Sequence, residues 1–114
     1  MPFDDARLRR VNECPESTRG DYVLYWMQSA RRLDHNHALD YALAQARRLQ
    51  RPLVVYEGLR LDYPWASRRL HRFILEGMQA NSEAAKRLGL TYWPWVERRP
   101  REGRGRLAGL AARA

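Results

Sequence analysis

Short apolar runs alternate with longer amphipathic stretches along this chain, and that alternation limits the folds open to it. The runs are rich in branched and aromatic residues, as in strands covered on both faces, and they span Tyr22–Met27, Leu53–Tyr56 and Thr91–Val96. A stretch with helical spacing of apolar residues follows each run. Crossovers of that length join parallel strands through right-handed connections. We therefore predict an α/β fold, with a parallel sheet flanked by helices.

The ends of the predicted helices carry recognisable signals. Asp34 or Asn36 is placed to cap the first helix, and Pro52 stops it. Ser67 is placed to cap the second helix, which Gly89 ends. Gly77 lies inside that helix at a cost of about 1 kcal/mol against alanine, and a close approach to a neighbouring element would explain it.

The pattern also predicts the order of the strands. Each crossover connects a strand to a parallel neighbour, so the second strand should lie between the other two. The first and third strands should then be outermost. Pro94 in the third run cannot donate to a ladder, which agrees with an edge position. Two apolar stripes should cover the sheet, through Leu39, Leu43 and Ala46 and through Leu70, Phe73 and Ile74.

The chain is strongly basic, with 21 Lys and Arg against 13 Asp and Glu and a net charge of +8. Attraction to a polyanion is one interpretation, because cations that neutralise phosphates release counterions. Solvated helix faces are the other, and the charge pattern favours neither. Any DNA binding should be weak, nonspecific and sensitive to salt.

Several classes of protein are disfavoured. No apolar run approaches the roughly 20 residues that span a bilayer, and acidic residues stand near the start where a signal peptide is positive. Cys14 stands alone, so we expect no disulfide framework and a cytoplasmic location. His35, His37 and His71 lack metal-ligand spacing, and we expect no metal site. Gly103-x-Gly105 is a poor signal for a phosphate loop, and no catalytic set is evident.

Candidate ligand-binding residues follow the first two strands. In open α/β sheets, ligands bind beyond the carboxyl ends of the strands. This rule selects a candidate crevice formed by Trp26, Met27, Arg31, Arg32 and Glu57. For each arginine taken singly, structural pairing with Asp34 or Glu57 is favoured over contact with an anionic ligand. For Trp26, burial is favoured at least as much as ligand contact. For Trp93 and Trp95, core packing is favoured over base stacking.

Several motifs carry a family resemblance. They are Tyr22-Val23-Leu24-Tyr25-Trp26-Met27, Arg31-Arg32 with Asn36-x-Ala38-Leu39, Pro52-Leu53-Val54-Val55, and Asp62-Tyr63-Pro64-Trp65-Ala66-Ser67-x-Arg69-Leu70-His71-Arg72-Phe73. Together they resemble the amino-terminal α/β domain of class II cyclobutane-pyrimidine-dimer DNA photolyases. The likeness covers all but about the first ten residues. The looser Asn-x-Ala-Leu pattern alone would indicate the wider photolyase and cryptochrome superfamily.

The resemblance implies a fragment of a larger enzyme, a deoxyribodipyrimidine photo-lyase. It implies a Rossmann-like sheet of which only three strands, in the order 3-2-1, are present. Residues 1–19 would be an extended lead-in and residues 20–114 a partial domain. FAD and the DNA-binding surface would belong to a helical domain absent here, and an antenna chromophore is possible in the full-length family. No catalytic residue carries over, and we expect no cofactor on this fragment and no activity alone.

Two other expectations accompany this interpretation. The first strand would present an unpaired apolar edge, so the chain should self-associate or be poorly soluble. Two alternatives stay open: a stand-alone basic α/β domain that binds nucleic acid or scaffolds a partner, and a fragment of a cryptochrome-type photosensor. The residues that separate repair from sensing do not lie in this chain.

Overall fold

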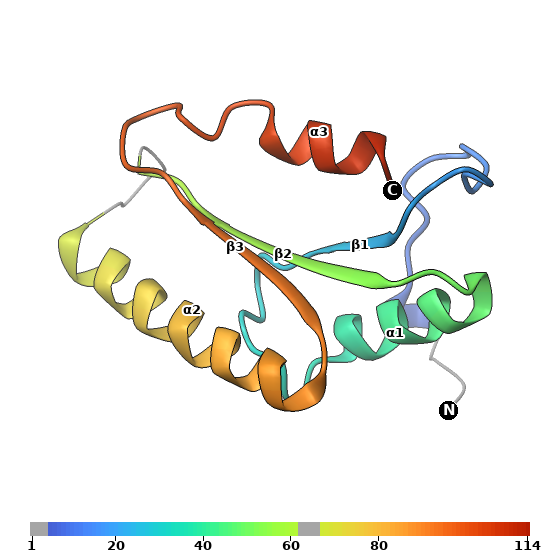
Figure 1. Ribbon diagram of the computed structural model, residues 1–114, viewed down its shortest axis with the longest axis horizontal. Helices are drawn as coiled ribbons and strands as arrows, with labels where there is room; N and C mark the ends of the chain where they lie inside the picture. The colour runs from blue at the N-terminus through green and yellow to red at the C-terminus, as the bar shows by residue number, and fades with distance from the viewer. Residues whose placement is uncertain (1–4, 62–66) are drawn as a thin grey trace.

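The computed structural model describes residues 5–61 and 67–114, in which three parallel strands alternate with three helices (Figure 1). The elements are the 3-10 turn η1 (Asp5–Arg7), β1 (Val23–Trp26), α1 (His37–Leu49), β2 (Leu53–Leu59), α2 (Arg68–Leu88), β3 (Thr91–Val96) and α3 (Arg106–Ala112). The predicted Rossmann-like α/β fold is confirmed. The motif residues 62–66 lie outside the described residues.

The sheet has β2 in its centre, in the order β1-β2-β3. Both pairings are parallel; Val23 is opposite Leu53, and Glu57 is opposite Pro94. The predicted order is therefore confirmed, and Pro94 lies on an edge strand as expected. The second strand is longer than predicted, because it continues past Tyr56 to Leu59.

Side-chain caps begin the two long helices, as the sequence predicts. The Asn36 side chain accepts a 3.0 Å hydrogen bond from the Leu39 amide at the start of α1. Ser67 accepts one of 3.1 Å from the Leu70 amide at the start of α2, and Gly89 ends that helix in the left-handed region. Each cap satisfies a backbone donor that the first helical turn leaves free.

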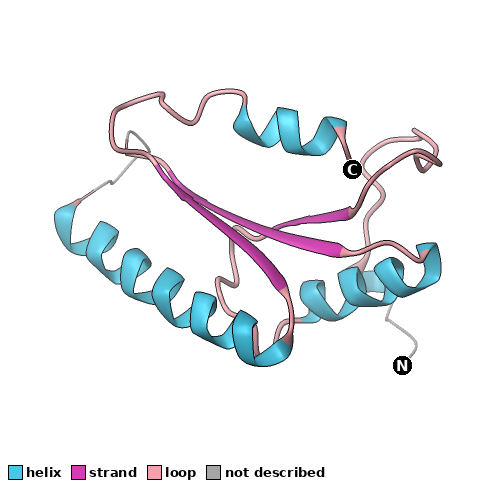
Figure 2. Cartoon of the chain, viewed as in Figure 1, coloured by secondary structure: helices cyan, strands magenta, loops and turns pink. Residues whose placement is uncertain are grey.

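Helices cover both faces of the sheet. Figure 2 shows α1 and α2 on one face and α3 on the other. The core lies between the sheet and α1, and it extends to the carboxyl-terminal half of α2. Its buried residues include Met27, Leu33, Leu39, Ala42, Ala46, Leu53, Val55 and Ala85. Among the described helices, none is long and apolar enough to cross a membrane.

The second predicted stripe covers the sheet less completely than expected. Phe73 is 73% exposed and Leu70 is 37% exposed, whereas Met78 and Ala85 are buried. The physical reason is length: the 21 residues of α2 extend past the sheet, so Leu70 and Phe73 are not covered by it (Figure 1). The expectation for Gly77 is wrong as well, because a side chain added there would meet nothing within 4 Å.

One edge of β1 is unpaired in the described structure. The amides of Val23 and Met27 donate to Pro52 O and Tyr56 O, at 2.8 and 2.9 Å. Because backbone groups alternate in direction along a strand, those of Leu24 and Trp26 face away from β2.

The end of α3 is attached to the start of β1. The Tyr22 hydroxyl donates a 2.5 Å hydrogen bond to Leu110 O, and the Asp21 amide donates to Arg113 O at 2.8 Å. Asp21 and Arg113 also form an ion pair of 3.1 Å. These contacts hold α3 over the face opposite α1 and α2.

Candidate ligand cavity at the carboxyl ends of the strands

A cavity of about 950 Å³ lies beyond the carboxyl ends of the three strands, under the β3–α3 loop and α3. It is lined by Trp26, Gln28, Arg31, Tyr56, Gly58, Leu59, Arg60, Ile74, Trp95, Glu97, Arg101, Gly103, Arg104, Gly105, Leu107 and Ala108. Its volume is within the usual range for small-molecule sites, roughly 300–1,000 Å³. The cavity is therefore large enough for an organic ligand of cofactor size.

The walls combine cationic and aromatic groups. The arginines are Arg31, Arg60, Arg101 and Arg104, and the aromatic residues are Trp26, Tyr56 and Trp95. Trp26 is 47% exposed, so its indole is available for contact. Guanidinium groups bind anions, and aromatic rings stack on planar groups. The cavity suits a planar ligand with negative charge.

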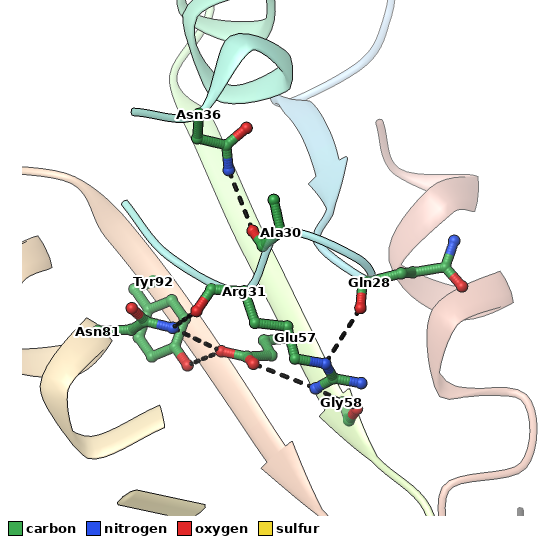
Figure 3. A network of polar contacts seen from close by, with 8 residues as sticks. All are labelled: Gln28, Ala30, Arg31, Asn36, Glu57, Gly58, Asn81 and Tyr92. Atoms are coloured by element: carbon green, nitrogen blue, oxygen red, sulfur yellow. Dashed lines mark hydrogen bonds and ion pairs between the residues drawn. The ribbon is translucent and has the colours of Figure 1, made fainter. Parts of the chain in front are cut away.

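A network of polar contacts holds Arg31 at the cavity wall (Figure 3). Its Nη1 donates to Glu57 Oε2 at 3.1 Å and to Gly58 O at 3.2 Å, and its Nε donates to Gln28 O at 3.1 Å. Within the described residues, its Nη2 group makes no hydrogen bond. Three contacts therefore fix the guanidinium and leave one of its nitrogens for a ligand.

The Glu57 carboxylate behind Arg31 is fully buried and well bonded. Its Oε1 accepts hydrogen bonds from the Tyr92 hydroxyl at 2.5 Å and from Asn81 Nδ2 at 3.0 Å. Burial and the hydrogen bond to Glu57 together raise the pKa of Tyr92 far above its usual range. Tyr92 is therefore a donor to Glu57 across the physiological pH range.

A second buried carboxylate, Glu97, connects two loops at the cavity. Its Oε2 accepts from the Leu61 amide at 3.0 Å, and its Oε1 accepts from the Gly103 amide at 3.2 Å. Leu61 belongs to the loop before α2, and Gly103 belongs to the loop before α3. Burial, with a smaller contribution from Glu97, raises the pKa of the nearby Tyr56. Glu97 thus sets the spacing of the two loops.

Trp95 forms one side of the cavity and leaves a polar atom without a partner. The guanidinium carbon of Arg106 lies 3.5 Å from the Trp95 ring centre, in a cation–π contact. Trp95 Nε1 and Arg106 Nε are buried and find no hydrogen-bond partner in the described structure. A side chain at Gly103 would come within 2.9 Å of Trp95 Nε1, so this position needs glycine.

The structure separates the five residues predicted for the crevice. Trp26 and Arg31 line the cavity. Met27 is fully buried in the core and does not reach the cavity, because it faces α1 rather than α3. Glu57 lies within β2 rather than after it, and acts on the cavity through its ion pair with Arg31. Arg32 is exposed and donates to the carbonyls of Asp34 and His35 instead.

Sequence reasoning missed the contribution of the third strand. Trp95 and Glu97 line the cavity, and so do Gly103 and Gly105 of the following loop. The signal was available, because the carboxyl ends of parallel strands meet at one edge and the crevice rule applies to all of them. The sequence instead favours core packing for Trp95, and its Gly103-x-Gly105 pattern is a poor signal for a phosphate loop. No metal-binding cluster of His, Cys, Asp or Glu occurs in residues 5–61 and 67–114.

Comparison with known proteins gives one informative result. No family model and no solved structure matches the chain. A deoxyribodipyrimidine photo-lyase of Methanothermobacter thermautotrophicus is 45% identical to it over 73 residues. This chain is related to a photo-lyase over part of its length. The match covers 64% of this chain but 16% of the photo-lyase, so most of that enzyme has no counterpart in the comparison.

Proposed function

We propose that this chain forms the amino-terminal α/β part of a class II light-dependent DNA-repair photolyase, which splits cyclobutane pyrimidine dimers. The 45% identity to a photo-lyase carries this proposal, and the parallel sheet supports it. In this proposal the flavin and the dimer-binding surface belong to a helical domain beyond the 73 matched residues. The isolated chain binds no FAD and is inactive by itself.

The cavity at the carboxyl ends of the strands is the proposed site of an antenna chromophore. Trp26 offers a ring for stacking, and the fixed guanidinium of Arg31 offers an anion contact. Glu57 holds Arg31, while Met27 and Arg32 support the fold around it. The chromophore would supply light absorption, and this chain would supply its binding and orientation.

A chimaera tests the proposed function. The segment of the Methanothermobacter enzyme that matches this chain is replaced by the corresponding residues of this chain. We expect the chimaera to bind FAD and to remove pyrimidine dimers from irradiated DNA in light but not in darkness. A folded, flavin-loaded chimaera without light-dependent repair would contradict the proposal, and so would FAD in the isolated chain.

A binding experiment tests the cavity separately. Anilinonaphthalene sulfonate is a planar aromatic anion whose fluorescence rises on binding. Arg31→Ala and Trp26→Ala should each weaken its binding about 5- to 10-fold, since each removes one contact worth about 1–1.4 kcal/mol. Trp93→Ala is the matched control, because Trp93 is similarly exposed but does not line this cavity. Equal loss in all three variants would argue against a defined site.

A further inference from the structure

A second cavity, of about 420 Å³, adjoins the first on the α3 face of the sheet. We call it the Trp93 cleft; it is lined by Tyr22, Trp93, Glu102, Arg104, Gly105, Arg106, Gly109, Leu110 and Arg113. Arg104 and Gly105 line both cavities, so the β3–α3 loop forms a shared wall. The proposed photolyase function uses none of the residues particular to this cleft.

Trp93, the tryptophan of the cleft, stands at one end of an aromatic row that crosses the sheet and leads to the first cavity. Trp26 is opposite Tyr56, and Tyr56 is opposite Trp93, so the three rings lie in one row across the sheet. Tyr56 in the centre is buried, whereas Trp93 is 44% exposed. Almost half of the Trp93 side chain is therefore open to contact with a ligand at this edge of the sheet. Trp93 therefore presents an accessible ring inside a cavity.

The charges around Trp93 are positive and largely uncompensated. Arg104 makes no side-chain hydrogen bond or ion pair in the described structure, and Arg106 Nε is buried without a partner. The carboxylate of Glu102, also in the wall, already accepts from the amides of Arg98 and Arg99 at 3.1 Å. Arg113 is paired with Asp21. An anion is the ligand charge that this arrangement fits.

We infer that the Trp93 cleft binds single-stranded nucleic acid, with an unpaired base on the Trp93 ring and the flanking phosphates at Arg104 and Arg106. Stacking needs a base free of its complementary strand, which favours a single strand over a duplex. The same guanidinium groups disfavour an apolar polypeptide, because docking would bury them without counter-charges. Nothing in this inference depends on flavin, on light or on pyrimidine dimers.

Fluorescence anisotropy of a labelled oligothymidylate, titrated with the full chain, tests the inference. Trp93→Ala should weaken binding about 5- to 150-fold, the range for one base–aromatic stack. Trp26→Ala should leave it unchanged, because Trp26 is similarly exposed on the same face but lines the other cavity. Arg104→Ala should weaken binding and reduce the slope of log K against log salt by about 0.7.

Further measurements separate binding from folding. Trp93→Phe keeps a stacking ring and should bind within a few-fold of the wild type, and circular dichroism checks that each variant is folded. A duplex of the same sequence should bind more weakly than the single strand. Equal affinity of the wild type and a folded Trp93→Ala variant would overturn the inference, as would the absence of binding at low salt. A dimer that Trp93→Ala dissociates would also overturn it, and would assign this face to self-association. None of these outcomes bears on light-dependent repair by the chimaera.

Discussion

The Tyr92 hydroxyl on β3 donates a 2.5 Å hydrogen bond to the Glu57 carboxylate, which lies inside the neighbouring strand β2. Glu57 is 1% exposed, and it accepts further hydrogen bonds from Asn81 on α2 and Arg31 beyond β1. A buried carboxylate without such donors would cost several kcal/mol. This one group therefore ties together β2, β3, α2 and the loop after β1.

Replacing Tyr92 by phenylalanine should lower the free energy of unfolding by about 1–3 kcal/mol, because the buried carboxylate loses a donor. Urea denaturation of both proteins measures the difference. Tyr56→Phe is the control, since Tyr56 is buried on β2 and its hydroxyl makes no hydrogen bond in the described structure. An equal loss in both variants would show that the hydrogen bond to Glu57 has no special role.

Stability should fall in alkaline solution. The pKa values of Tyr92 and Tyr56 are raised in the folded chain, chiefly by burial, from the ordinary value of 10.0. The protonated tyrosine is thus favoured by folding, and its contribution is complete below about pH 10 and lost as pH rises beyond it. Denaturation midpoints measured across this range should decline with pH, and Tyr92→Phe should make the decline shallower. A midpoint independent of pH would contradict the burial of these hydroxyls.

Two glycines, one within α2 and one directly after it, should respond in opposite directions to substitution by alanine. Gly77 lies within the helix with open space around it, so Gly77→Ala should stabilise the chain by about 0.5–1 kcal/mol. Gly89 follows the last turn of the same helix with φ +69°, a backbone conformation that disfavours residues with a Cβ atom. Gly89→Ala should therefore destabilise the chain by about 1 kcal/mol. Thermal unfolding of the two variants gives the comparison, and a stabilising Gly89→Ala would contradict the left-handed helix end.

The unpaired edge of β1 should drive concentration-dependent self-association, which sedimentation velocity detects. Trp26→Lys should reduce it, because a lysine on an edge strand opposes pairing with another strand. Trp93→Lys adds the same charge on β3, the other edge strand, where Pro94 already lacks a backbone donor. This variant should change self-association little. A wild-type chain that remains monomeric at high concentration would refute the role assigned to this edge.

The sequence predicted the fold well because local signals and long-range pairing agree. Asn36 and Ser67 cap their helices as predicted, and Pro94 marks the edge of the sheet. The exposed first turns of α2 were not predictable in the same way. Helical spacing shows which residues share a face, as Leu70 and Phe73 do, but not how far the sheet beneath that face extends.

The candidate site was only partly predictable. Trp26 and Arg31 follow from the rule that ligands bind at the carboxyl ends of parallel strands. Met27 was misplaced because the two faces of a strand alternate, and the sequence does not show which face of β1 meets α1. The sequence leaves open whether Arg31 pairs with an acidic residue or with an anionic ligand. In the structure Glu57 lies inside β2, where it forms an ion pair with Arg31.

Glu97 has a consequence for how the molecule responds to force or to a bound ligand. Its two carboxylate oxygens bind the amides of Leu61 and Gly103, in the loops that lead to α2 and α3. These helices cover opposite faces of the sheet (Figure 2). Movement of either loop is therefore transmitted through a single carboxylate to the far side of the sheet. Without that carboxylate, the two loops would lose this direct link, while the sheet and the contacts of Tyr22 and Asp21 with α3 would still connect the two faces.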